Sequence, residues 1–120
     1  MTGVIKPGET GFNSILKSEG WQIASITYDA QYSKEGFTSM KRHLTSDEVF
    51  VLIKGNATLH TVEDGKLVSK NLEKETVYCV YKGTWHYLEI SEDALLFVTE
   101  NSKMLPEETE TEELECLVQK

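Results

Sequence analysis

The chain contains little cysteine, the residue whose disulfides hold very small or secreted domains together. Only two of its 120 residues are cysteine, Cys79 and Cys116, and they lie far apart. A chain of this length buries roughly two-thirds of its unfolded surface, so it can fold as one domain without disulfides or a structural metal. Its first residues contain no apolar run like that of a signal sequence. We therefore expect reduced thiols and a cytoplasmic protein.

Long apolar runs and an excess of positive charge are also missing. No segment approaches the length of a membrane span. Twenty acidic residues against 12 basic ones leave a net charge of −8. Because nucleic-acid-binding proteins need clustered Lys and Arg, we expect neither nucleic acid nor a membrane as partner. A P-loop, a dinucleotide-binding glycine motif and a CxxC pair are absent too.

The negative charge is concentrated near the C-terminus. Six glutamates and no basic residue lie between Pro106 and Glu115. Such a run is typical of a solvated or frayed tail that aids solubility. We expect residues 1–104 to form a single domain and residues 105–120 to form an acidic C-terminal tail. Apolar residues return at Leu114–Val118, where the chain can dock on the domain or on a second subunit.

Helical periodicity is nearly absent, and short β-branched and aromatic runs separated by turn residues take its place. Asp64-Gly65 is a two-residue hairpin signal. The segment Ile15–Glu19 fits a turn of helix or a short strand. About eight short strands at this spacing predict an all-β sandwich or small barrel. The predicted strands are Gln22–Asp29, Phe37–His43, Glu48–Ile53, Ala57–Val62, Lys66–Asn71, Thr76–Val80, Trp85–Ile90 and Leu95–Thr99.

Three residues that can bind a metal, His43, Glu48 and His86, each lie at or near the end of a predicted strand. In a closed barrel, strand alternation can aim all three into one cavity, and Lys41 would share the face of His43. Two imidazoles and one carboxylate can hold Zn, Mn, Fe or Ni and leave coordination positions open for substrate. The remaining histidine, His60, is predicted to be a surface residue outside this site.

The spacing of these residues follows a known pattern. Four residues separate His43 from Glu48, six separate Glu48 from Gly55, and two separate Gly83 from His86. With this spacing, residues 37–90 resemble the cupin superfamily, and small single-domain bacterial cupins in particular. The cupin motifs are written G-x5-H-x-H-x(3,4)-E-x6-G and G-x5-P-x-G-x2-H-x3-N. The resemblance implies a double-stranded β-helix, an all-β jelly-roll barrel with its site in the mouth.

The chain departs from these motifs at several positions. Lys41 stands where the family has its first metal-binding histidine, and Glu35 stands at the leading glycine. In the second motif, Glu75, Tyr81 and Ile90 replace the glycine, the proline and the asparagine. Because a protonated lysine cannot bind a metal, the departures leave either a three-ligand site or an empty one.

Lys41 has two interpretations. It can form an ion pair with Glu48 and fill the space of the metal, because a buried lysine must be paired or lose its proton. It can instead be a catalytic residue that holds a carboxylate, phosphate or enolate beside the ion.

Three functions stay open at this point. The chain can be a divalent-metal enzyme that acts on a small polar molecule, or a non-catalytic module that binds a sugar or an organic acid. It can also be a metal-free cupin in which Lys41 fills the site. Cupins commonly pair, and edge strands need cover, so we expect a homodimer formed through the N-terminal stretch and Leu114–Val118.

Overall fold

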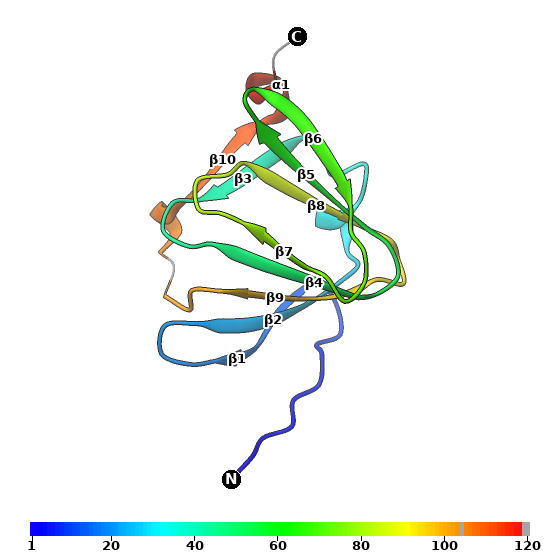
Figure 1. The fold of residues 1–120 in the computed structure, drawn as a ribbon, viewed down its shortest axis with the longest axis vertical. Coiled ribbons are helices and arrows are strands. Elements are labelled where there is room, and N and C mark those ends of the chain that lie inside the picture. The colour runs from blue at the N-terminus through cyan, green and yellow to red at the C-terminus, as the bar shows by residue number, and fades with distance from the viewer. Residues whose placement is uncertain (104, 119–120) are drawn as a thin grey trace.

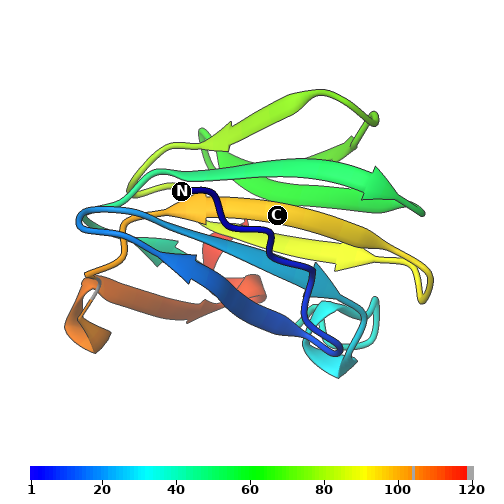
Figure 2. The ribbon, with the colours of Figure 1, turned by 90° about the horizontal axis from the view of Figure 1, so that it is seen from below.

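Two antiparallel sheets of five strands face each other in this computed structural model, which describes residues 1–103 and 105–118 (Figures 1 and 2). Across the first sheet, here called sheet A, the strands run in the order β1 (Phe12–Lys17), β2 (Gln22–Thr27), β9 (Leu95–Glu100), β4 (Glu48–Lys54) and β7 (Val77–Val80). Sheet B has the order β10 (Thr109–Glu113), β3 (Ser39–His43), β8 (His86–Ile90), β5 (Ala57–Glu63) and β6 (Lys66–Asn71).

Helix is confined to three short segments of the described chain: η1 (Ala30–Tyr32), η2 (Pro106–Glu108) and α1 (Leu114–Leu117). Among residues 1–103 and 105–118, no helix has the length and apolar character needed to cross a membrane. The predicted all-β jelly-roll barrel is confirmed.

Every predicted strand is present, with ends displaced by a few residues. The Asp64-Gly65 hairpin joins β5 to β6, with positive φ angles of 54° and 74° at its two residues. Strand β3 begins at Ser39 because a turn precedes it, in which the Thr38 N–H donates to the Gly36 carbonyl at 2.9 Å. Two strands were not predicted: β1, which overlaps the ambiguous segment Ile15–Glu19, and β10.

The core lies between the two sheets and consists of alternate residues from their inner faces. On β9, Leu96 and Val98 are buried while Leu95 and Phe97 are half-buried. Phe50 and Leu52 on β4 have the same period of two. At the start of β4 the same inward face carries Glu48, so the alternation that builds the core also buries a carboxylate.

The acidic C-terminal segment is solvent-exposed at most positions of Thr109–Glu113, as expected, but these five residues are an ordered strand and not a frayed tail. These residues form β10, which pairs antiparallel with all of β3, from Thr109 opposite His43 to Glu113 opposite Ser39. The strand covers the otherwise open edge of β3, and Arg42 balances part of its charge through an ion pair with Glu110. Residue 104, where we placed the end of the domain, and the last two residues of the predicted tail lie outside the described residues.

The prediction that His60 is a surface residue is wrong. Its side chain does point away from the barrel core, but it is only 11% exposed. Phe37 stacks on its ring at 4.4 Å, and Ser69 Oγ and Glu89 Oε1 lie 2.7 and 3.1 Å from its two nitrogens. The side chain of Phe37, from the loop before β3, thus covers this part of the outer face of sheet B. Strand alternation alone cannot reveal such a cover.

A substitution at Leu96 tests the position of the hydrophobic core. We expect Leu96→Ala to destabilise the protein by about 2–5 kcal/mol, because it removes a fully buried side chain and leaves a cavity. Urea denaturation followed by circular dichroism measures the change. Leu67→Ala, at a leucine that is 41% exposed, is the matched control and should cost much less. Equal losses in the two variants would contradict the core described here.

Candidate metal centre

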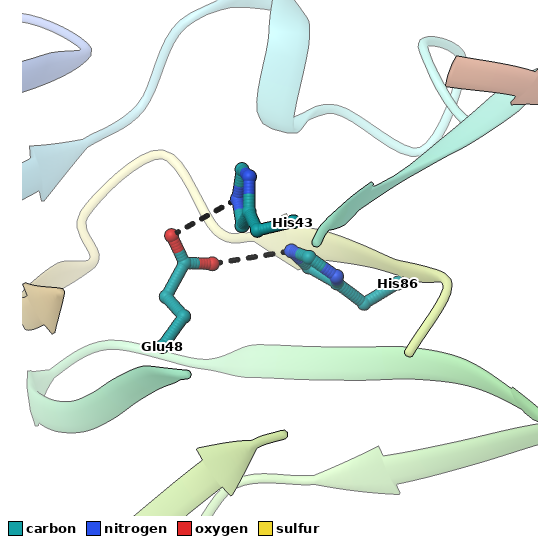
Figure 3. A group of neighbouring side chains, drawn as sticks. All are labelled: His43, Glu48 and His86. Carbon is teal, nitrogen blue, oxygen red and sulfur yellow. Dashed lines mark hydrogen bonds and ion pairs between the residues drawn. The ribbon is translucent and has the colours of Figure 1, made fainter. Parts of the chain in front are cut away.

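Three side chains meet at one end of the barrel, and they come from both sheets. His43 is the last residue of β3 and His86 the first of β8, both in sheet B, whereas Glu48 is the first residue of β4 in sheet A. In Figure 3 the carboxylate of Glu48 points at both imidazoles from the opposite side of the barrel. The cluster therefore bridges the two layers where their strands end.

Two loops bring these strand ends together. The loop between β3 and β4 is fixed by Ser46, whose buried hydroxyl accepts from Asn101 N–H at 3.0 Å. The loop before β8 is fixed at Gly83, whose N–H donates to the His43 carbonyl at 2.7 Å. Gly83 has φ of +84°, a left-handed conformation that favours glycine. This φ angle explains why a glycine precedes His86 at this spacing.

The distances within the cluster suit a small cation. His86 Nε2 lies 3.1 Å from Glu48 Oε1, and His43 Nε2 lies 3.6 Å from Glu48 Oε2. One ligand atom from each of the three residues lies within 4.8 Å of the others. Each residue is mostly shielded from solvent. The His43-Glu48-His86 cluster is thus able to hold a metal ion.

The other nitrogen of each imidazole is already engaged. His86 Nδ1 lies 2.9 Å from the Thr84 carbonyl oxygen, which can only accept, so Nδ1 carries the proton. His43 Nδ1 lies 3.0 Å from Thr109 Oγ1. With Nδ1 protonated, a neutral His86 would turn the lone pair of Nε2 toward a carboxylate, and this contact needs a proton or a metal ion between the two. The donor set therefore fits a divalent cation.

The protonation of the metal-free cluster follows from its contacts. Burial favours a neutral Glu48, but hydrogen bonds with His43 and His86 outweigh burial and hold its pKa well below the usual range. Burial also favours a neutral His86, but the hydrogen bond and charge of Glu48 prevail and raise the pKa of His86. At neutral pH, Glu48 is therefore an anion that favours a cation between itself and the rings.

Glu100, at the end of β9, is a further ionisable group beside the His43-Glu48-His86 cluster. Sequence reasoning missed it. Burial and the adjacent Glu48 carboxylate raise the pKa of Glu100 to about 9, so it is neutral at pH 7. Gln22 Nε2 lies 3.4 Å from its Oε1, whereas its buried Oε2 has no hydrogen-bond partner among the described residues. The alternation Leu96-Val98-Glu100 could have signalled it, because it puts a carboxyl on a core-facing position.

The cluster opens into a cavity of about 440 Å³. Lys41 lines this cavity from the strand that carries His43, and it stands opposite His86 in the sheet. Among the described residues, no ion pair joins Lys41 to Glu48, and Lys41 is exposed. The interpretation in which Lys41 pairs with Glu48 is therefore not supported. The other lining residues are Phe12, Ile26, Gln31, Tyr32, Gly36, Ser39, Phe50, Tyr87, Leu88 and Glu100.

Comparisons with known proteins rest on structure alone, since no protein-family model and no curated protein sequence matches this chain. Solved structures do resemble it. A crystal structure of CapF has a TM-score of 0.66 at 17% identity and covers 89% of this chain, which in turn spans 33% of CapF. The nucleoside dehydratase Pac13 has a TM-score of 0.66 at 7% identity, over 96% of this chain and 88% of Pac13.

A cupin-2 domain protein from Shewanella frigidimarina has a TM-score of 0.59 at 16% identity and covers 78% of this chain and 83% of its own. At such low identities the likeness shows the fold, and it agrees with the two-sheet architecture and with the motif spacing around His43, Glu48 and His86. The chain has the small cupin jelly-roll fold.

Proposed function

We propose that this protein is a divalent-metal enzyme that acts on a small, negatively charged polar molecule in the barrel mouth. The observation that carries the proposal is the convergence of His43 Nε2, His86 Nε2 and the Glu48 carboxylate on the wall of one cavity. His43, His86 and Glu48 would hold the ion. Zn, Mn, Fe and Ni all accept two imidazoles and one carboxylate.

A bound divalent ion would polarise a carbonyl or hydroxyl oxygen of the substrate. Three protein ligands leave positions open for that oxygen, and Lys41 stands on the side where cupins have another histidine. Lys41 would hold the negative charge of the substrate as an ammonium group. Glu100, neutral at pH 7, would offer its buried Oε2, which has no hydrogen-bond partner in the described part of the chain, to a hydroxyl or carbonyl group of the substrate.

The remaining wall limits what can bind. Phe12, Ile26, Phe50 and Leu88 are apolar, so part of the ligand should be apolar as well. A volume of about 440 Å³ suits a molecule the size of a small organic acid or a nucleoside. Enzymes with this fold include an oxalate decarboxylase and a nucleoside dehydratase by their names. We also propose, from the sequence, that the protein is cytoplasmic and forms a homodimer.

A non-catalytic binding module is the second candidate, because the cavity and Lys41 serve binding equally well. Turnover separates the two functions. Metal-loaded protein should convert at least one member of a panel of hydroxy acids, keto acids and nucleosides, followed by mass spectrometry. Saturable binding without conversion across the panel would favour the binding module.

Removing a ligand tests the metal site. We expect His86→Ala to abolish uptake of Zn, Mn, Ni or ferrous ion measured by calorimetry, because only His43 and Glu48 would remain. His60→Ala is the matched control: it also removes a buried histidine, but one on the outer face of sheet B. It should lose stability and keep metal uptake. If wild type takes up none of the four ions, the metal site is refuted.

Metal affinity should rise with pH. The ion must displace the proton that Glu48 favours on His86, whose pKa is raised, so protons compete with the metal below that pKa. We expect about a tenfold gain per pH unit for each proton released, flattening once His86 is neutral. Zinc titrations between pH 5.5 and 8.5 measure the slope. An affinity independent of pH would show that His86 Nε2 is already free.

Lys41→Met tests the anion-holding role of the lysine. Because Lys41 is exposed, we expect the affinity for a small carboxylate such as malonate to fall only about two- to fivefold. Metal uptake should not fall, since Lys41 is not a ligand in this arrangement. Lys66→Met, in the hairpin remote from the cavity, is the control. Unchanged malonate binding in Lys41→Met would remove this role.

A further inference from the structure

We infer that Thr109 is a positioning residue for His43, so that the metal site depends on docking of the acidic strand β10. The inference rests on the metal-binding function proposed above. It assigns a role in the site to a segment that lies more than 60 residues from His43 in sequence.

The two histidines are held in different ways. His86 Nδ1 is fixed by the carbonyl of Thr84, two residues away on its own loop. His43 Nδ1 is fixed by the side chain of Thr109, which is also the residue opposite it in the β3–β10 pairing. The orientation of His86 is therefore local, whereas that of His43 is supplied by a strand from the end of the chain.

The contact holds the ring of His43 in the orientation that a metal needs. A metal ion at Nε2, which lies 3.6 Å from Glu48, would leave the proton of a neutral His43 on Nδ1, where Thr109 Oγ1 would accept it. Without Thr109 the ring can turn about its side-chain bonds. Hydrogen-bond partners of this kind typically change metal affinity by about 10–100-fold.

Strand β10 delivers Thr109 in a fixed register because both of its ends are held. At one end the Leu44 N–H donates to the Glu108 carbonyl at 2.8 Å, and at the other the Leu114 N–H donates to the Thr38 carbonyl at 3.0 Å. Between them Arg42 Nε donates to Glu110 Oε1 at 2.7 Å. Among the described strands, β10 pairs with β3 alone. It is therefore an edge strand whose docking bears directly on one candidate ligand.

The test uses Thr109→Val, Thr109→Ser and Thr111→Val. Valine keeps the shape and strand preference of threonine but removes the hydroxyl. Thr111→Val is the matched control, because it makes the same change two residues further along β10, opposite Lys41. Zinc affinity is measured by calorimetry. Nitrogen-15 NMR of the imidazoles in metal-free protein reports the hydrogen bonding of His43 Nδ1 and Nε2.

We expect Thr109→Val to bind zinc about 10–100-fold more weakly and to shift the ring-nitrogen resonances of His43, because the hydrogen bond at Nδ1 is lost. Thr109→Ser should restore both readouts, and Thr111→Val should leave both unchanged. Wild-type zinc affinity in Thr109→Val overturns the inference, as does an equal loss in Thr111→Val. If wild type binds no zinc, the proposed function fails, and the NMR readout still decides whether Thr109 positions His43: unchanged ring-nitrogen resonances of His43 in Thr109→Val overturn the inference.

Discussion

The burial of one carboxylate between two imidazoles is the constraint on which the rest of this site depends. Glu48 lies on the inner face of sheet A, where burial alone would make it neutral, and only cationic or hydrogen-bonding partners keep it charged. His43 and His86 supply these partners from sheet B. The same contact joins the two layers at the end of the barrel and creates a strong preference for a cation there. Glu100, next to Glu48, stays neutral because it is itself buried and because the charge of Glu48 disfavours a second negative charge beside it.

Sequence reasoning succeeded where local patterns control structure. Short β-branched and aromatic runs separated by turn residues identified the core strands, and Asp64-Gly65 marked its hairpin through a backbone conformation that few other residue pairs adopt. The spacing of His43, Glu48 and His86 was informative because each residue begins or ends a strand, so that the short connections between strands leave them little freedom. The structure brings these three side chains together as the spacing predicts, and it places Lys41 on the wall of the same cavity.

Sequence reasoning failed where structure depends on non-local partners. The glutamate-rich run carries the composition of a solvated tail, yet Thr109–Glu113 pairs with β3, because the edge of β3 is open to it and Arg42 forms an ion pair with Glu110. His60 is buried by Phe37, which reaches it only because the chain turns before β3. No pattern within either segment contains this information.

Replacing a histidine by lysine at position 41 changes more than the ligand count. A fourth imidazole would compete for the positions that a substrate needs, and it would add no charge to bind an anion. Lysine leaves these positions open and puts a positive charge at the cavity wall, where it also disfavours protonation of His86. Under the proposed function, the charges of Lys41 and Glu48 would act in the same sense on a substrate: the lysine would attract its anionic group, and the carboxylate would hold the ion that binds its oxygen. A site with three ligands and a lysine is accordingly better suited to a small anion than the four-ligand site it resembles.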